Sequence, residues 1–210
     1  MKRISIISFG IFAFSCSLAV AAIERPPIRY TALYNNDIRH GEEDFYAHRL
    51  EAIFAKEFNF ASQYQMKAQM VPFLDLRYNI VRQKRERAVA GIEFGLSPLS
   101  FFYVGQQFRY SWYSESLHQR RVIDSTSMPE ALTKVIFSHQ LIPGKEILKG
   151  YFGSEYTYDF RHQKGVRAET LIGLIAPIGK SCEVDVNWRH RDRVHDYDCD
   201  TFETSVSYTF

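Results

Sequence analysis

Apolar and polar residues alternate along most of this chain. In residues 87–96, Ile92 and Phe94 share one side of an extended strand, while Arg87 and Glu93 share the other. The same period of two runs through residues 202–210, where the chain ends. A period of two places successive side chains on opposite faces of a β-strand. The pattern therefore predicts an all-β protein whose strands each have one apolar and one polar face.

The alternating stretches predict about ten strands, with eight or twelve as alternatives. They lie near residues 27–34, 45–57, 64–81, 87–96, 101–113, 131–141, 146–160, 166–176, 182–190 and 200–210. Short turn-like stretches recur at residues 57–62, 97–100, 142–146 and 177–181, and longer charged stretches lie between them. Short turns at one end and longer loops at the other are typical of an antiparallel up-and-down transmembrane β-barrel. This is the fold class that we predict.

Residues 45–58 leave two interpretations open. Apolar residues at Tyr46, Leu50, Ile53 and Phe58 fit a helical period, and the segment is rich in good helix formers. We prefer a strand, because the alternating stretch that follows needs a partner. Pro72 lies inside that stretch and cannot donate to a ladder, so it marks either a bulge or a strand boundary.

The charged residues within strands decide which face points inward. A charge in the middle of a strand is costly against lipid and is tolerated in a lumen. The basic residues on the polar faces are Lys67, Arg77, Arg87, Arg109, Lys134, Lys149, Arg167 and Arg189. The acidic ones are Asp75, Glu93, Glu155, Asp159, Glu169, Glu183, Asp185 and Glu203. Equal numbers of both signs, in a barrel with a narrow interior, predict a lumen lined and largely closed by ion pairs.

The start of the chain has the pattern of an export signal. Lys2 and Arg3 precede an apolar run from Ile4 to Phe14, and small residues follow around residues 19–22. Such a pattern is typical of a secretory signal peptide. Removal of residues 1–21 would leave residues 22–210 as the barrel. Cys16 offers a lipoprotein alternative in a less suitable sequence context.

Composition narrows the class of protein further. The formal net charge of +2 is far from the strong basic excess of a dedicated nucleic-acid binder. Aromatic residues make up 15% of the chain although the mean hydropathy is slightly negative at -0.26. A membrane barrel has this combination, because it shows its aromatic residues to lipid and encloses polar groups. A soluble secreted barrel of lipocalin type remains an alternative, and it would place its apolar side inward.

The last strand resembles the assembly signal of bacterial outer-membrane β-barrel proteins. The matching residues are Phe202, Val206, Tyr208 and the terminal Phe210, and Thr204 departs from the pattern. The resemblance implies recognition by the outer-membrane insertion machinery and pairing of the last strand with the first. It also implies an outer-membrane location, and we expect a monomer in contact with lipid. An even number of strands places both termini on the periplasmic side.

Two observations bear on the subfamily of outer-membrane barrel. The stretch "RYTALYNNDI" and the chain length are similar to the small porins for acidic oligosaccharides, which are expected to line their pores with arginine. The balanced inward set departs from that pattern. We therefore predict a non-enzymatic structural envelope protein or a narrow diffusion channel, with a porin for small acidic solutes as an alternative.

Enzymatic readings rest on histidines and carboxylates near the end of the chain. The densest group comprises His190, Asp192, His195, Asp196, Asp198, Cys199 and Asp200. Such groups can bind a metal or act as an acid and base, as at the rim of omptin proteases, but a solvated loop looks the same. His40 and His118 lie in other outer loops, and His48 and His139 in strands without a neighbouring serine motif. We predict no catalytic residue, metal or cofactor, and keep an omptin-like protease or a lipid A-modifying enzyme as alternatives.

Two further features concern the outer end and the cysteines. Arg82, Lys84, Arg85, Arg87, Arg120 and Arg121 are basic residues that lipopolysaccharide phosphates could bind. Cys182 and Cys199 could form a disulfide after export. If the hairpin tip lies near His195, the two cysteines are at opposite ends of a hairpin and too far apart to bond. We favour the second reading.

Overall fold

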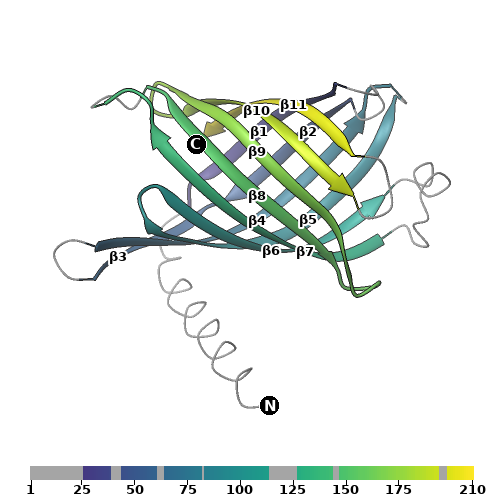
Figure 1. Cartoon of the computed structure of the whole chain (residues 1–210), viewed down its shortest axis with the longest axis horizontal. Coiled ribbons are helices and arrows are strands. Elements are labelled where there is room, and N and C mark those ends of the chain that lie inside the picture. Colours follow the sequence, from purple (N-terminus) through teal and green to yellow (C-terminus); the bar gives the residue numbers. More distant parts are fainter. Residues whose placement is uncertain are drawn as a thin grey trace, which may run out of the picture.

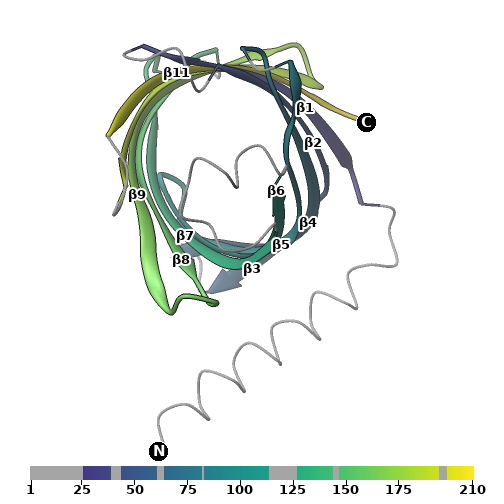
Figure 2. The same ribbon diagram turned by 90° about the vertical axis from the view of Figure 1, so that its right-hand side faces the viewer.

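A computed structural model of the chain describes residues 26–38, 44–60, 64–81, 83–113, 127–143, 147–193 and 198–210. Its strands are β1 (Ile28–Asp37), β2 (Phe45–Ala52), β3 (Phe54–Phe60), β4 (Tyr64–Asn79), β5 (Lys84–Leu99), β6 (Phe102–Tyr113), β7 (Ser127–Gln140), β8 (Lys149–Asp159), β9 (Lys164–Ile178), β10 (Cys182–Arg193) and β11 (Cys199–Thr209). They form one antiparallel sheet that closes on itself as a barrel (Figure 1; Figure 2). Within the described residues no helix is long and apolar enough to cross a membrane.

The barrel closes through β1 and β2. β1 pairs with β11 on one side and with β2 on the other, and β2 pairs in turn with β4. β2 and β3 keep a single register against β4, so they are two parts of one strand interrupted at Ile53. Counted in this way, the sheet is a closed barrel of 10 strands, and the predicted fold class and strand number are confirmed.

The ambiguous segment 45–58 is extended. It lies in β2 and β3, so the strand prediction is confirmed and the helical alternative is wrong. Its helix formers are overridden because β1 and β4 satisfy the backbone groups of β2, while Phe45 and Ala47 pack inside. Pro72 lies in β4 opposite the gap between β2 and β3, where a missing N–H is least costly.

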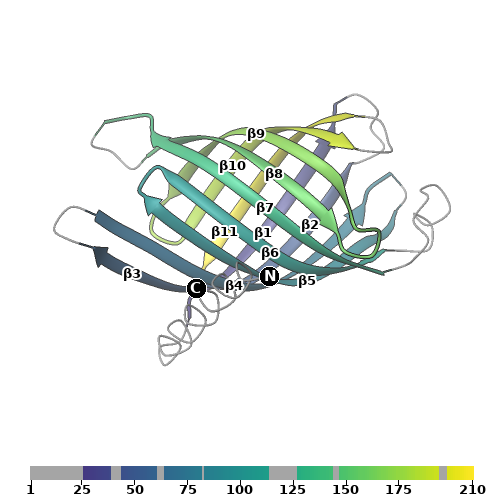
Figure 3. The same ribbon diagram turned by 60° about the horizontal axis from the view of Figure 1, so that its bottom comes forward.

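The connections divide between two ends of the barrel. We call the end where β1 starts and β11 finishes the terminal end, and the opposite one the distal end. At the terminal end the Phe210 amide donates to the Ile28 carbonyl at 2.9 Å. The turns between β5 and β6 and between β9 and β10 are there, whereas β6 ends and β7 begins at the distal end. The β3–β4 hairpin projects beyond the wall at the terminal end (Figure 3).

The two faces of the sheet differ as the alternation predicts. Phe152 and Tyr208 point outward and are 50% and 45% exposed, whereas Glu93 and Arg191 point inward and are each 3% exposed. The apolar flank therefore forms the outer surface and the charged flank is enclosed. A soluble barrel of lipocalin type would have the opposite arrangement, so that alternative is wrong.

Candidate functional site in the barrel lumen

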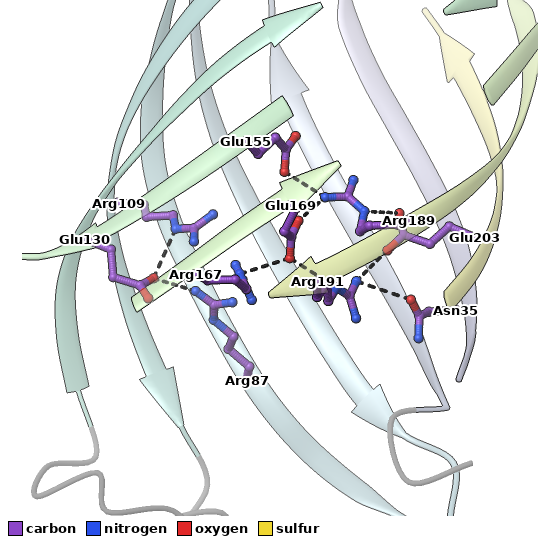
Figure 4. Close-up of polar contacts among 10 residues, drawn as sticks. All are labelled: Asn35, Arg87, Arg109, Glu130, Glu155, Arg167, Glu169, Arg189, Arg191 and Glu203. Atoms are coloured by element: carbon purple, nitrogen blue, oxygen red, sulfur yellow. Dashed lines mark hydrogen bonds and ion pairs between the residues drawn. The ribbon is translucent and has the colours of Figure 1, made fainter. Parts of the chain in front are cut away.

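A network of charged side chains crosses the lumen between β5 and β1. We call it the charged belt; its members are Arg87, Arg109, Glu130, Glu155, Arg167, Glu169, Arg189, Arg191 and Glu203, together with Asn35 (Figure 4). Each neighbouring strand from β5 round to β1 contributes at least one of them. Residues two apart on one strand, such as Arg189 and Arg191, reach the same face because the side-chain period is two.

One group of the belt is centred on Glu130 of β7. Arg87 Nη2 donates to its carboxylate at 2.5 Å, and Arg109 Nε donates to it at 3.0 Å. Ser111 Oγ donates to the same oxygen at 2.7 Å. Glu130 therefore accepts hydrogen bonds from two guanidinium groups, which come from β5 and β6.

The other group is centred on Arg189 of β10. Its guanidinium contacts Glu155 at 2.7 Å, Glu203 at 3.1 Å and also Glu169. Arg191 lies beside it and contacts Glu203 at 2.6 Å and Asn35 at 3.3 Å. Buried charges are tolerated when each is paired and hydrogen-bonded. Each charged group of the belt has an oppositely charged partner, but some of its guanidinium N–H groups have no acceptor among the described residues.

Two cavities lie on the two sides of the belt. The terminal cavity, lined by Tyr103, Lys149, Tyr151 and Asp185 among others, measures about 410 Å³. The distal cavity, lined by Phe45, Arg77, Arg87 and Arg109 among others, measures about 150 Å³. Leu33, Glu155, Arg189 and Glu203 line both of them. Three belt residues, Glu155, Arg189 and Glu203, therefore lie between the two spaces, and most of the other belt residues line the distal cavity.

The terminal cavity stays open because its tyrosines lie along the wall. Tyr151 Oη donates to Asp185 at 2.9 Å, and the ring crosses Gly173, where an added Cβ would meet Tyr151 Cζ at 2.5 Å. Tyr103 donates to Glu93 and accepts from Gln69 at 3.1 Å. Glycine removes the side chain that would otherwise push these rings into the lumen.

The distal cavity is instead lined by cations. Seven arginines line it: Arg49, Arg77, Arg87, Arg109, Arg167, Arg189 and Arg191. Three of them also cover aromatic rings. Arg77 Cζ lies 3.8 Å from the Phe45 ring centroid, Arg49 Cζ 4.1 Å from that of Phe73, and Arg87 Cζ 5.1 Å from that of Tyr113. Such stacking holds the guanidinium planes against the wall.

The predicted inward residues are distributed over these spaces. Arg109, Glu155, Arg167, Glu169, Arg189 and Glu203 belong to the belt, Asp75 and Arg77 line the distal cavity, and Lys149 and Asp185 line the terminal one. Glu93 contacts Lys134 at 2.8 Å. Lys67 is exposed on the β3–β4 hairpin, and Glu183 is half-buried near the start of β10. Asp159 caps the turn after β8 by accepting from the amide of Arg161 at 2.8 Å.

The basic residues predicted to contact lipopolysaccharide differ in where they lie. Arg87 points into the lumen and is 5% exposed, so its assignment to the outer surface is wrong. Its neighbour Arg85 is exposed. Arg82, Arg120, Arg121 and the side chain of Lys84 lie outside the described residues.

The histidine and carboxylate cluster forms no metal site among the described residues. His190 contacts Asp200 at 2.8 Å on the outer side of the sheet, and Asp192 and Asp198 are exposed. His48 contacts the Tyr30 hydroxyl at 2.7 Å, and His139 is exposed on β7. His40, His118, His195 and Asp196 lie outside the described residues.

The two cysteines lie at opposite ends of the β10–β11 ladder. Cys182 is opposite Tyr208, and Cys199 is opposite Arg191. No disulfide joins them, so the reading that placed them at opposite ends of the hairpin is confirmed.

Sequence reasoning missed several lumen residues: Asn35, Arg49, Glu51, Glu130, Tyr151 and Arg191. Glu130 and Arg191 were assigned to loops, because β7 begins at Ser127 rather than residue 131 and β10 ends at Arg193 rather than residue 190. Extending the alternation through both charged stretches would have found them. Tyr151 carries a different signal, since it is opposite Gly173 on the neighbouring strand.

No protein-family model and no curated protein matches this chain. Among solved structures it is similar to a KdgM porin, with 12% identity over 88% of this chain and 99% of that one and a TM-score of 0.42. It is also similar to the β domain of the Bordetella autotransporter BrkA, with 13% identity over 89% and 99% of the two chains and a TM-score of 0.43. For OpdK of Pseudomonas aeruginosa with vanillate, the identity is 12% over 87% and 56%, and the TM-score 0.40. The closed sheet, with its apolar outer face and charged interior, has the architecture of a bacterial outer-membrane β-barrel.

Proposed function

We propose that the protein is a non-enzymatic outer-membrane β-barrel that acts as a narrow diffusion channel, with the charged belt as its constriction. The observation that supports this is the position of the two cavities, which share Leu33, Glu155, Arg189 and Glu203 at the belt. A barrel of about eight strands is just filled by side chains, and one of about sixteen leaves a wide channel. Ten strands lie between these limits, which suits the passage of ions and small solutes.

Conductance in planar bilayers tests the channel. We expect small unitary steps for the unmodified protein and larger ones for Glu155→Ala, because Glu155 lines both cavities and contacts Arg189 at 2.7 Å. Glu57→Ala is the matched control, since Glu57 is exposed on the β3–β4 hairpin. Silence of both the unmodified protein and Glu155→Ala, in samples that migrate anomalously before boiling, would contradict a channel and favour a purely structural role.

The location is tested in cells. We expect the folded protein in the outer-membrane fraction, with the terminal end facing the periplasm. An epitope inserted within residues 114–126 should then be labelled on intact cells, and one within residues 142–146 should not. Equal labelling of the two positions would contradict this orientation.

Recognition by the insertion machinery is a further part of the proposal. Phe202, Val206, Tyr208 and Phe210 form an apolar row on the outer face, and Phe210 is 75% exposed. Deletion of Phe210 should lower the folded fraction in membranes, whereas Ser207→Ala in the same strand should not. Equal folded fractions in the two variants would count against a terminal signal.

The distal end is proposed to contact lipopolysaccharide through its basic residues. Arg85 is the exposed member of that set whose side chain the structure describes. Arg85→Ala should weaken co-purification of lipopolysaccharide, with Arg29→Ala near the terminal end as the control. Unchanged co-purification in Arg85→Ala would contradict the contact.

The non-enzymatic part is tested separately. Lipid A mass and peptide cleavage should be the same in cells that express the unmodified protein and His190→Ala. A difference between the two would support an enzyme at the rim.

A further inference from the structure

The distal cavity contains guanidinium N–H groups that no acceptor satisfies. Arg77 Nε, Arg87 Nε and Arg109 Nη2 are buried and have no hydrogen-bond partner among the described residues. The side chains of Arg87 and Arg109 are 6% and 9% exposed. A buried donor without a partner carries the full cost of its lost hydration, and this cost is larger for a charged group.

Two like charges are also cross-strand neighbours in this part of the wall. Arg77 of β4 is directly opposite Arg87 of β5. Directly opposed like charges destabilise a sheet unless something lies between them. Glu130 pairs with Arg87 and Arg109, and Asp75 is opposite Arg49 on β2. Asp75 lines the same cavity, but neither it nor Glu130 accepts a hydrogen bond from Arg77 Nε or Arg87 Nε.

The overall count of charges points the same way. Seven arginines and four carboxylates, Asp75, Glu155, Glu169 and Glu203, line the distal cavity. Glu130 and Glu51 add counter-charge from beside it, through Arg87, Arg109 and Arg49. One cation remains in excess, so the cavity favours an anion over a cation.

We propose that the distal cavity binds a small inorganic oxyanion of the phosphate or sulfate class, held by Arg77, Arg87 and Arg109. The volume of about 150 Å³ has room for such an ion with several waters. Three donors from three strands suit the oxygens of a tetrahedral ion, and arginine is the side chain best adapted to bind them. The inference rests on the proposed function and deepens it, because an ion held by Arg87 and Arg109 would occupy the passage at the belt.

Thermal unfolding of the full chain in detergent tests this, with inorganic phosphate as the probe and chloride at matched ionic strength as the reference. Phosphate should raise the unfolding midpoint in a saturable way, because a ligand that binds only the folded state stabilises it. The shift should disappear in Arg77→Gln and in Arg109→Gln. It should persist in Arg161→Gln, because Arg161 is exposed in the turn after β8 and does not line this cavity.

Equilibrium dialysis with phosphate should give one bound ion per chain, and Arg77→Gln should reduce this binding at least tenfold. Equal midpoints in phosphate and chloride would overturn the inference, since water would then fill the cavity. An equal phosphate shift in Arg77→Gln and in the unmodified protein would also overturn it. A protein that binds phosphate but never conducts contradicts the channel alone, and one that conducts without binding phosphate contradicts the anion site alone.

Discussion

The two cavities of one lumen are built on different principles. In the terminal cavity, tyrosines lie flat over glycines and hydrogen-bond along the wall, which leaves a space of about 410 Å³. In the distal cavity, arginines from neighbouring strands face one another and leave about 150 Å³. Alternation therefore determines which residues point inward but not how much space they leave. That space depends on the size and packing of the inward side chains.

The largest expected effect comes from the residue that separates the cavities. Arg189→Ala would leave the carboxylates of Glu155, Glu169 and Glu203 buried without their shared partner. Breaking a buried ion pair by removing one partner costs about 3 to 5 kcal/mol. Denaturant unfolding in detergent measures this loss, with the exposed Arg161→Ala as the control. A loss below about 1 kcal/mol would mean that the belt is hydrated and contributes little.

A smaller loss is expected on the distal side alone. Glu130→Gln keeps the shape but removes the charge that Arg87 and Arg109 share at 2.5 and 3.0 Å. Hydrogen bonds to charged groups contribute about 1.5 to 3 kcal/mol, so we expect a loss of about 2 kcal/mol in the free energy of unfolding. Lys134→Gln, whose partner Glu93 also binds Tyr103 and Gln107, is the comparison outside the distal cavity and should cost less. Equal losses in the two variants would break the contrast between the two regions.

Much of the fold follows from the sequence because a membrane barrel imposes strict alternation on every strand. Phe152 faces outward and Glu155 faces inward, as strict alternation requires. The strand between residues 45 and 58 could be predicted because the alternating stretch after it needs a partner. Charged strand ends are harder, because Glu130 and Arg191 continue strands through stretches that have the composition of loops. Composition alone does not separate a charged strand end from a loop.

The ion pairs within the lumen could not be predicted from the sequence either. Arg189 of β10 contacts Glu155 of β8, so the pair spans the intervening strand β9. Such a contact depends on the tilt and register of three strands together, and neither is encoded locally. The free space in the terminal cavity likewise depends on the position of Tyr151 over Gly173 of the neighbouring strand.

The terminal cavity can be closed by a single wall substitution. Gly173→Val would place a branched side chain where Tyr151 now lies, because even a Cβ would meet its ring at 2.5 Å. Overpacking of this kind costs about 1 to 3 kcal/mol, and we expect a value near the lower end, about 1 kcal/mol, since the ring can swing into the empty cavity. Unitary conductance should fall at the same time. Unchanged conductance with a displaced ring would show that the terminal cavity is not part of the passage.

The smallest expected effect is at Lys149, and it sharpens the contrast most. Lys149 lines the terminal cavity, and its ammonium group takes part in none of the side-chain ion pairs or hydrogen bonds found among the described residues. A charge that makes no such contact contributes little to stability, so Lys149→Gln should change the free energy of unfolding by less than about 0.5 kcal/mol. The reversal potential in a salt gradient should nevertheless shift towards cations, because one positive charge leaves the passage. Arg109→Gln, in the distal cavity, should shift the reversal potential in the same direction but with a clear loss of stability. If Lys149→Gln lost as much stability as Arg109→Gln, the charged residues of both cavities would stabilise the fold, and the two cavities would not differ in this respect.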